Sequence, residues 1–393
     1  MSEPTRWRSI WLLFFCGCTL SLHIGKLPPS LPLLTETFSL RLSQAGNLVA
    51  TFSILIGIMG LFLGTVVARF GFVAFATVGL MLAGVGSVIG ATAGSFSLLI
   101  FSRTIEGLGW IVAVVAIPSL MARLATASDK PVVLGIWGAF LPVGAGTMLL
   151  LAPILQASGG WRLSWWVAAF ASIVAAVILL EIGRRNQPLF SPLKQSSIIT
   201  PWFEIKSIRA WGLFFSFFFY SFQFMALTSF LPTVFMAEGG ISLASASRWT
   251  ALVVLTNATG NLLAGQLIRR GVPVYQLLSL AAVSVGIAAL ITLLPLPIYI
   301  RICSAVVFAV MGGLIPGTLF ATASRIATKP AATGILIGFM LQAAGLGQWL
   351  GPMLLTRLVE ATGLWWAGGL FLMLMASMGA IAAIIGFRTL PAG

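Results

Sequence analysis

Charged side chains are scarce in this sequence: Asp, Glu, Lys and Arg together make up 8 % of its 393 residues. Soluble globular proteins carry about 25 % charged residues, so this chain has too little polar surface to face water on all sides. Hydrophobic residues account for 59 % of the chain, and its mean hydropathy is +1.07. The composition therefore indicates an integral membrane protein.

Residues that carry most enzyme chemistry are also few, with eight carboxylates, one histidine and three cysteines. The single aspartate, Asp129, lies in a polar loop, and His23 has no second histidine to act with. A Ser-His-Asp triad, a carboxylate dyad and a His/Asp metal cluster therefore lack their partners. The chain also has no Gly-x-x-x-x-Gly-Lys-Ser/Thr phosphate loop. We expect no enzyme, no catalytic residue, no metal and no cofactor.

Hydrophobic spans of roughly 20 residues, the length that crosses a bilayer, follow one another along the chain. The pattern predicts an all-α protein with 12 transmembrane helices. The first six spans lie near residues 10–34, 44–68, 73–93, 98–122, 132–155 and 161–181, and the second six near 209–235, 246–268, 273–294, 298–322, 331–355 and 364–387.

The net charge of +14 is explained by topology. With the N-terminus inside, fifteen Lys and Arg residues fall on the inner side and four on the outer side. Positive residues accumulate in cytoplasmic loops, so both termini are expected in the cytoplasm, with the chain in a bacterial-type cytoplasmic (inner) membrane. The expected surroundings are the lipid bilayer, with no nucleic-acid partner, and nothing in the sequence points beyond a monomer.

Landmarks of the first half recur about 200 residues later. Arg103 and Pro118 are fifteen residues apart in the fourth span, as are Arg301 and Pro316 in the tenth. Two parallel six-helix halves are the plan of transporters whose halves rock about a central site. We therefore predict two pseudo-symmetric bundles, an N-terminal one at 1–182 and a C-terminal one at 207–393, joined by a cytoplasmic linker at 183–206.

Short motifs resemble those of the major facilitator superfamily, and the likeness extends along the whole chain. GTVVARFG (Gly64–Gly71) is similar to the family's Gly-x-x-x-Asp-Arg-x-Gly loop between helices 2 and 3, with Ala68 replacing the acidic residue. RTIEGLG (Arg103–Gly109) resembles the Arg-x-x-Gln-Gly-x-Gly motif of helix 4, with Glu106 replacing glutamine. LPVGAG (Leu141–Gly146) resembles the Gly-Pro-x-x-Gly-Gly element of antiporters, with two of its glycines replaced.

This resemblance implies the fold of the superfamily and a secondary transporter. Within the superfamily, LGIWGAF and LPPSLPLL are most similar to the cyanate/nitroimidazole branch. The resemblance also assigns conformational or gating roles to Gly64, Arg69, Gly71, Pro142 and Gly146.

Arg103 and Glu106 place two charges inside the fourth span. An ionisable group near the bilayer centre costs roughly 2.5–3.5 kcal/mol, so such groups face a cavity or one another. Two interpretations are open: a structural ion pair between residues that share a helix face, or a pathway arginine beside a proton-holding glutamate. Burial disfavours a charged carboxylate, whereas an arginine favours it. A substrate that competes for Arg103 would therefore change the proton occupancy of Glu106.

His23 and Lys26 share a face of the first helix, directly before Pro28 and Pro29, which disturb the helix. A broken helix beside a charge points to a binding site. Lys26 and Arg103 each lie ~10 Å deep at 1.5 Å per residue, so they are expected to meet. Lys26 has the alternative of snorkelling toward the outer headgroups. His23 is either a packing residue or a group that titrates near neutral pH.

The second half contributes mainly uncharged polar side chains. Tyr220, Gln223 and Asn257 are the candidate substrate contacts among them, with Gln223 and Asn257 favoured, and Gln223 corresponds to His23 under the repeat. The alternative is that such side chains only hydrogen-bond across a helix interface. Arg301 lies near the outer end of its helix, where it either snorkels or acts as the counterpart of Arg103. The candidate substrate-binding residues are Lys26, Arg103, His23, Tyr220, Gln223, Asn257 and Arg301, and the candidate proton-coupling residue is Glu106.

The deep charges are mostly positive, which favours an anionic substrate. We predict a secondary active transporter that works by alternating access, couples to protons and moves a small organic or inorganic anion. The alternative is efflux of a drug or lipophilic metabolite by proton antiport, which the antiporter-like LPVGAG stretch favours. A channel is disfavoured, because channels are usually built from several copies or ringed charges, whereas this chain has a two-fold repeat.

Overall fold

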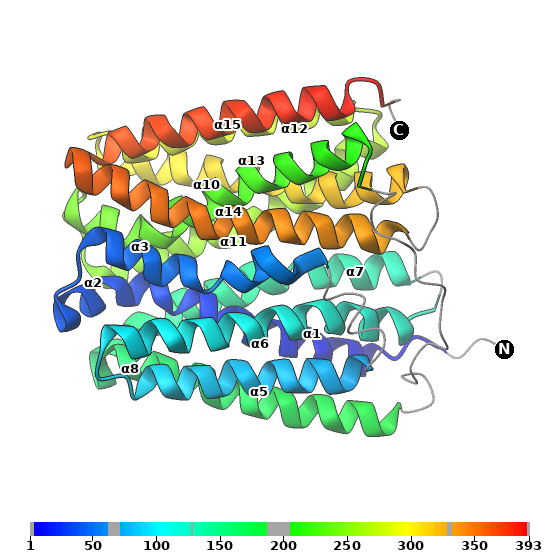
Figure 1. The fold of residues 1–393 in the computed structure, drawn as a ribbon, viewed down its shortest axis with the longest axis horizontal. Coiled ribbons are helices and arrows are strands. Elements are labelled where there is room, and N and C mark those ends of the chain that lie inside the picture. The colour runs from blue at the N-terminus through cyan, green and yellow to red at the C-terminus, as the bar shows by residue number, and fades with distance from the viewer. Residues whose placement is uncertain (1–3, 62–70, 127–128, 187–204, 328–331, 391–393) are drawn as a thin grey trace. The chain divides into compact units, whose positions relative to one another are not determined.

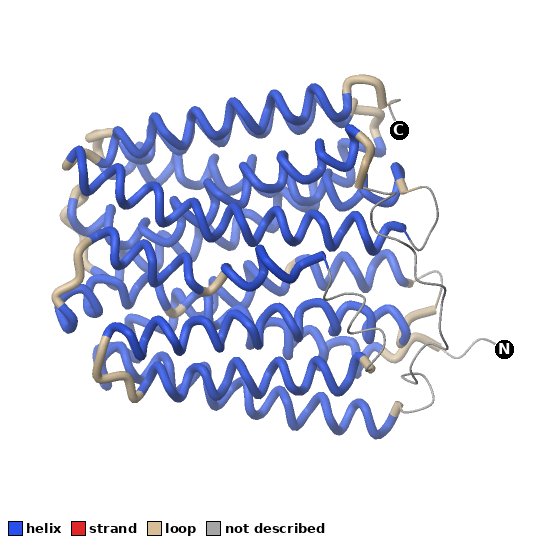
Figure 2. Tube along the Cα trace, in the orientation of Figure 1, coloured by secondary structure: helices blue, strands red, loops and turns tan. Residues whose placement is uncertain are grey.

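The structure is a computed structural model that describes residues 4–61, 71–126, 129–186, 205–327 and 332–390. Figure 2 shows that every regular element in these ranges is a helix. Eleven helical stretches within them are long and apolar enough to cross a membrane. One of these, Val132–Arg185, covers two predicted spans and contains non-helical backbone at Gly159 and Gly160. Counted as two helices, it brings the described part of the chain to the predicted 12 transmembrane helices.

The helices are labelled in Figure 1. They are α1 (Trp7–Gly25), α2 (Leu27–Phe38), α3 (Leu42–Thr51), α5 (Phe72–Ala91), α6 (Phe96–Arg123), α7 (Lys130–Gly138), α8 (Phe140–Arg185), α10 (Ile208–Ala237), α11 (Leu243–Arg269), α12 (Val274–Leu293), α13 (Ile298–Ile326), α14 (Ala332–Thr362) and α15 (Trp365–Phe387).

Contacts divide the chain into two compact units. Unit 1 consists of Met1–Leu33 and Phe62–Ile198, and unit 2 of Leu34–Leu61 and Ile199–Gly393. The bundles predicted at 1–182 and 207–393 stay a prediction. Most of the predicted linker, residues 187–204, lies outside the described residues.

In unit 1, α5 packs against α6 and α8, and α1 packs against α8 and α6. Glycines allow these helices to approach closely. A Cβ on Gly79 of α5 would lie 2.6 Å from the backbone nitrogen of Ala113 on α6. A Cβ on Gly86 would lie 2.8 Å from the backbone nitrogen of Glu106. Small residues at such crossings are the usual device of membrane helices, and here they bring the charged turn of α6 against α5.

The first predicted span is divided into α1 and α2 at Lys26. Proline has no amide proton, so Pro28 and Pro29 cannot donate to the carbonyls one turn before them. The carbonyls that lose their helical donors in this way are those of Ile24 and Gly25. Next to them, the carbonyl of Lys26 accepts from Ser30 Oγ at 2.7 Å, and the carbonyl of His23 accepts from Arg103 Nη1 at 2.8 Å. The predicted disturbance of the helix beside Lys26 is confirmed.

In unit 2, α10 packs against α14 and α15, while α12 packs against α13 and α15. α3 comes early in the sequence but packs along α14 (Figure 1). Its backbone nitrogen at Ser43 donates to Glu360 Oε2 at 2.7 Å. Farther along, Ser53 Oγ donates to Gln348 Oε1 at 3.0 Å. Unit 2 therefore holds one helix that the sequence repeat assigns to the first half.

Candidate functional site

Glu106 lies in α6 with both of its carboxylate oxygens engaged. Oε1 accepts from Lys26 Nζ at 2.5 Å, and Oε2 forms an ion pair with Arg103 Nη1. Nδ1 of His23 lies 3.3 Å from Oε1. His23, Lys26 and Glu106 are fully buried, and Arg103 is 2 % exposed. These four residues, predicted from the sequence as two pairs with Lys26 and Arg103 meeting, form a single buried group that we call the ion cluster.

The surroundings of Lys26 decide between the two interpretations of its charge. Its Nζ also donates to Ser87 Oγ at 2.7 Å and lies 4.5 Å from the centre of the Trp165 ring. A snorkelling lysine would hold its ammonium in water or among headgroups, whereas Lys26 is fully buried. The snorkelling alternative is therefore wrong. Lys26 and Arg103 meet on Glu106, at one depth in unit 1.

Three uncharged residues contact the ion cluster and were not found from the sequence, namely Ser87, Trp165 and Ser172. Ser87 of α5 donates to the carbonyl of Trp165 at 2.8 Å, and Ser172 Oγ of α8 lies 2.8 Å from His23 Nε2. Ser87 is 61 residues from Lys26 and Ser172 is 149 residues from His23. The available signal was their polarity in apolar helices, which many packing serines share.

The antiporter-like stretch Leu141–Gly146 packs directly on α1. A Cβ on Gly144 would lie 2.7 Å from Ser21 Cβ, and one on Gly25 would lie 2.8 Å from Ala145 Cα. Pro142 and Gly146 are buried in α8 on either side of this contact. The stretch therefore sits against the helix that carries His23 and Lys26.

Two further gating candidates lie outside the described residues, namely Gly64 and Arg69. Gly71 is described and directly precedes α5 with a φ of 97°. That left-handed conformation favours glycine, so the backbone geometry explains why residue 71 is a glycine.

The ion cluster carries two basic side chains, Lys26 and Arg103, against one carboxylate. Removing either partner of a buried ion pair leaves an uncompensated charge at a cost of about 3–5 kcal/mol. A proton on Glu106 would release donors from both Lys26 and Arg103 at once. An incoming anion could then take the place of the carboxylate as their acceptor. No group of three His, Cys, Asp or Glu residues suited to a metal ion occurs in the described ranges.

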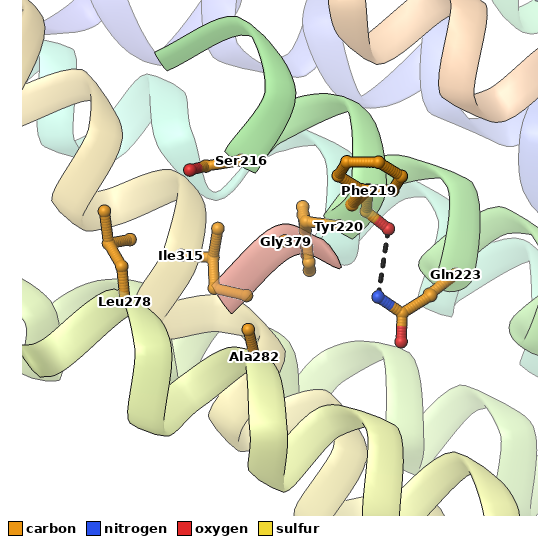
Figure 3. A pocket seen from close by; sticks show the side chains of 8 residues that line it. All are labelled: Ser216, Phe219, Tyr220, Gln223, Leu278, Ala282, Ile315 and Gly379. Carbon is orange, nitrogen blue, oxygen red and sulfur yellow. Dashed lines mark hydrogen bonds between the residues drawn. The ribbon is translucent and has the colours of Figure 1, made fainter. Parts of the chain in front are cut away.

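The uncharged candidates of unit 2 gather on α10 and α11. Asn257 Nδ2 donates to Tyr220 Oη at 3.1 Å and to the carbonyl of Ala309 at 3.0 Å. Gln223 Nε2 donates to the carbonyl of Phe219 at 3.0 Å, the dashed bond in Figure 3. These contacts hold Tyr220 and Asn257 together as a buried pair, one turn from Gln223.

Gln223 and Tyr220 also line a small cavity of about 10 Å³ inside unit 2. Figure 3 shows Ser216 and Gln223 near opposite ends of the row of α10 side chains that faces it. Neither Ser216 Oγ nor Gln223 Oε1 has a hydrogen-bond partner among the described residues. The rest of the lining is apolar and is formed by Leu278, Ala282, Ile315 and Gly379.

Arg301 lies apart from these residues, at the start of α13. Its Nε donates to the carbonyl of Thr292 at 2.8 Å, and its Nη1 lies 3.9 Å from Glu238 Oε2. The side chain is 1 % exposed, so Arg301 does not snorkel. Under the repeat it corresponds to Arg103, but Ser304 stands where Glu106 would be, and the carboxylate comes from the end of α10 instead.

A family model described as the Major Facilitator Superfamily matches residues 13–352. The chain is 28 % identical over 292 residues to the cyanate transport protein CynX of Escherichia coli, covering 70 % of this chain and 71 % of that protein. It is 24 % identical over 255 residues to the probable sulfoacetate transporter SauU of Cupriavidus necator, covering 60 % of this chain and 58 % of that protein. A shorter match, 26 % over 178 residues, covers 44 % of this chain and 45 % of the quinolone resistance protein NorA of Staphylococcus aureus.

The fold has a counterpart among solved structures. A crystal structure of a bacterial homologue of the human lysosomal transporter Spinster aligns with a TM-score of 0.80 at 18 % identity, over 98 % of this chain and 97 % of that chain. At this identity the likeness concerns the fold alone. Together with the family match across most of the sequence, it bears out the resemblance seen in the motifs. The chain is a multi-pass integral membrane protein that belongs to the major facilitator superfamily of transporters.

Proposed function

We propose that this protein is a proton-coupled carrier of a small organic or inorganic anion, working by alternating access of its two six-helix halves. Lys26 and Arg103 bind the anion and Glu106 holds the coupled proton. The positive-inside pattern supports a cytoplasmic (inner) membrane location with both termini in the cytoplasm. A monomer suffices for this mechanism, because all members of the ion cluster come from one chain.

The observation that carries the proposal is the sharing of one buried carboxylate by two buried cations. While Glu106 is ionised, it occupies the donors of Lys26 and Arg103 and competes with any other anion. When Glu106 takes a proton, those donors are released to the substrate. A proton and a monovalent anion that enter together leave the net charge of the ion cluster unchanged. Either one alone would change that charge in a low-dielectric interior, which costs free energy. The site therefore favours binding both or neither.

The names of two relatives support an anion. Cyanate and sulfoacetate are both small anions, and the proteins so named align with 70 % and 60 % of this chain. A cavity for a cationic drug would need acidic side chains, whereas the ion cluster has a surplus of basic ones. The charge and the relatives therefore favour the same class of substrate.

Unit 2 supplies the rest of the proposed substrate contacts. Tyr220, Gln223 and Asn257 offer neutral donors and acceptors, and Arg301 offers a third positive charge in addition to those of Lys26 and Arg103. In the same proposal, the conformational change depends on the loop residues Gly64, Arg69 and Gly71 and on the α8 stretch at Pro142 and Gly146, which packs on α1.

Efflux of a drug or lipophilic metabolite by proton antiport is the second candidate. It is favoured by the likeness to the quinolone resistance protein NorA over 44 % of the chain and by the antiporter-like stretch. In that case protons and substrate move in opposite directions, and Lys26 and Arg103 serve to tune Glu106 rather than to bind cargo.

Transport in proteoliposomes that contain a pH-sensitive dye tests the proposal. Small anions such as cyanate and sulfoacetate are expected to drive proton movement without a pre-set gradient, and lipophilic drugs are not. Glu106→Gln is expected to keep anion exchange but to lose accumulation driven by a pH gradient. Glu181→Gln, at an exposed pair with Arg185, is the matched control and should behave as the wild type.

Two other outcomes would contradict the proposal. Proton movement with drugs alone would support the antiport alternative and make the basic residues structural. Accumulation that persists in Glu106→Gln would remove this residue from coupling and leave it as a structural ion pair.

A further inference from the structure

Tyr220 and Asn257 share a hydrogen bond whose direction is fixed by a third group. Asn257 Nδ2 donates to Tyr220 Oη at 3.1 Å and to the carbonyl of Ala309 at 3.0 Å. A carbonyl oxygen only accepts, so the amide of Asn257 turns its nitrogen, with both hydrogens, toward Ala309 and Tyr220. Tyr220 Oη is therefore the acceptor in the bond with Asn257.

A second amide holds Asn257 in the same orientation. Asn261, one turn along α11, donates from Nδ2 to the backbone carbonyl of Asn257 and to its Oδ1, both at 3.2 Å. Asn257 thus has a donor facing its amide oxygen and two acceptors facing its amide nitrogen. A Cβ on Gly260 of α11 would lie 2.0 Å from the carbonyl oxygen of Val310 on α13, so the missing side chain lets these two helices come close enough for Asn257 to bridge them.

This bond leaves the hydroxyl hydrogen of Tyr220 for another acceptor. A tyrosine hydroxyl accepts through its oxygen and donates its one hydrogen. Among the residues that the structure describes, none accepts that hydrogen, and Tyr220 is only 7 % exposed. A buried polar hydrogen without an acceptor is unfavourable. The site therefore favours a ligand that supplies an acceptor.

We propose that Tyr220 donates its hydroxyl hydrogen to the anionic substrate, and that Asn257 is a positioning residue that keeps this hydrogen free by donating to Tyr220 itself. This assignment rests on the proposed anion carrier and deepens it. Both amide hydrogens of Asn257 are engaged, so Asn257 has none to offer an anion. It acts through Tyr220 rather than on the substrate.

The alternative is a purely structural bond. Polar side chains of membrane helices often hydrogen-bond only across a helix interface, and Asn257 joins α11 to both α10 and α13. In that case a water molecule takes the hydrogen of Tyr220, and the anion does not touch it. The two interpretations differ in what loss of the hydroxyl does to the affinity for the anion.

Tyr220→Phe removes the hydroxyl and keeps the ring, which stacks on Phe217 with centroids 6.1 Å apart. Exchange of cyanate and of sulfoacetate is measured in proteoliposomes, because exchange needs no net proton transfer. We expect the half-saturating concentration to rise about 10- to 100-fold, the usual loss of a hydrogen bond to a charged group, with little change in the maximal rate. Tyr299→Phe, at a tyrosine that is 78 % exposed, is the matched control. An unchanged half-saturating concentration in Tyr220→Phe would overturn the proposal.

A double-mutant cycle tests the role of Asn257. Asn257→Leu alone is expected to raise the half-saturating concentration, because nothing then fixes the direction of the Tyr220 hydroxyl. In the Tyr220→Phe background the same change should cause no further rise, since the group it acts through is gone. Rises that multiply, or a fall in maximal rate that is equal in both backgrounds, would contradict a positioning role. Thr259→Ala, at an exposed residue of α11, is the control.

The hydroxyl can also be observed directly, because the sequence has three tyrosines. The full-length protein is labelled with ¹³C at tyrosine Cζ, the carbon that bears the hydroxyl, and examined by NMR in detergent. Tyr220→Phe identifies the Tyr220 signal by its loss. Sulfoacetate should shift this signal and leave those of Tyr275 and Tyr299 in place. A Tyr220 signal that saturating anion does not move would show that water takes the hydrogen, against the proposal.

Failure of this inference and failure of the proposed function give different results. If the wild type exchanges anions and Tyr220→Phe does so with the same half-saturating concentration, the anion carrier stands and the Tyr220 contact does not. If the wild type exchanges neither anion, the proposed function fails, and the role of Tyr220 and Asn257 fails with it.

Discussion

Glu106 divides its two carboxylate oxygens between Lys26 and Arg103, and none of the three side chains is more than 2 % exposed. In a buried group of this kind, stability depends on the net charge of all its members together. Losing the carboxylate leaves two cations facing one another, whereas losing Lys26 leaves a balanced pair of Arg103 and Glu106. Stability should therefore respond unequally to the loss of each member.

We expect Glu106→Gln to lower the free energy of unfolding by about 3–5 kcal/mol, the usual cost of breaking a buried pair from one side. Lys26→Met should cost less, because Arg103 still neutralises Glu106. Thermal unfolding in detergent measures both. Added anion substrate should restore part of the loss in Glu106→Gln, since it binds the folded state in place of the carboxylate. A larger loss for Lys26→Met than for Glu106→Gln would contradict a surplus of positive charge in the ion cluster.

At the scale of the element, glycine determines which helices pack as close neighbours. α3 and its continuation to residue 61 lie along α14 in unit 2. A Cβ on Gly345 of α14 would meet the backbone nitrogen of Gly57 and would lie 2.5 Å from the carbonyl carbon of Ile56. Backbone atoms cannot give way as the end of a flexible side chain can, so this crossing depends on the missing side chain.

Gly345→Ala is expected to destabilise the protein by roughly 1–3 kcal/mol, as overpacking commonly does, and to impair transport. Gly334→Ala is the matched control in the same helix, because a Cβ at that position meets nothing within 4 Å. Alanine is the better helix former in a helix interior, whereas Gly334 lies in the first turn of α14. A lower unfolding midpoint for Gly345→Ala than for Gly334→Ala therefore gives a lower limit to the steric cost. Equal midpoints would show that α3 does not need this close contact.

At the scale of the whole molecule, the two halves share a plan and differ in charge. Arg103 recurs as Arg301, but Ser304 stands in the place of Glu106, and Ala226 in the place of Lys26. The neutral pair Tyr220–Asn257 lies in unit 2 instead. A group of ion pairs that served only to stabilise a helix bundle would be expected in both halves. Because the second half lacks it, the asymmetry favours a functional role for the ion cluster.

Coupling one proton to one monovalent anion makes transport electroneutral. We expect the initial rate of anion uptake into proteoliposomes to rise with a pH gradient and to be unaffected by a potassium diffusion potential set with valinomycin. A single net charge moved across 100 mV would be worth about 2.3 kcal/mol, a change of about 50-fold in accumulation. An effect of that size would contradict the one-to-one stoichiometry and call for a second coupled ion or a different anion charge.

Much of the fold follows from local chemistry. The spans and their number can be read from hydrophobic length, and the disturbance at Lys26 from Pro28 and Pro29. The break at Gly159 and Gly160 falls between the spans predicted at 132–155 and 161–181, so it too follows from hydrophobic length. The pairing of Arg103 with Glu106 follows from a spacing of three residues, which is a local property of any helix.

Other parts of the site were decided only by tertiary structure. Ser87 and Ser172 reach Lys26 and His23 across 61 and 149 residues, and Arg301 faces the carboxylate of Glu238, directly after α10. The sequence by itself determined the membrane environment, the helices and the surplus of positive charge, because these depend on composition and short-range spacing. Which charges share a carboxylate, and which hydroxyl holds the single histidine, was decided by helix packing, because such contacts join residues that no local pattern relates.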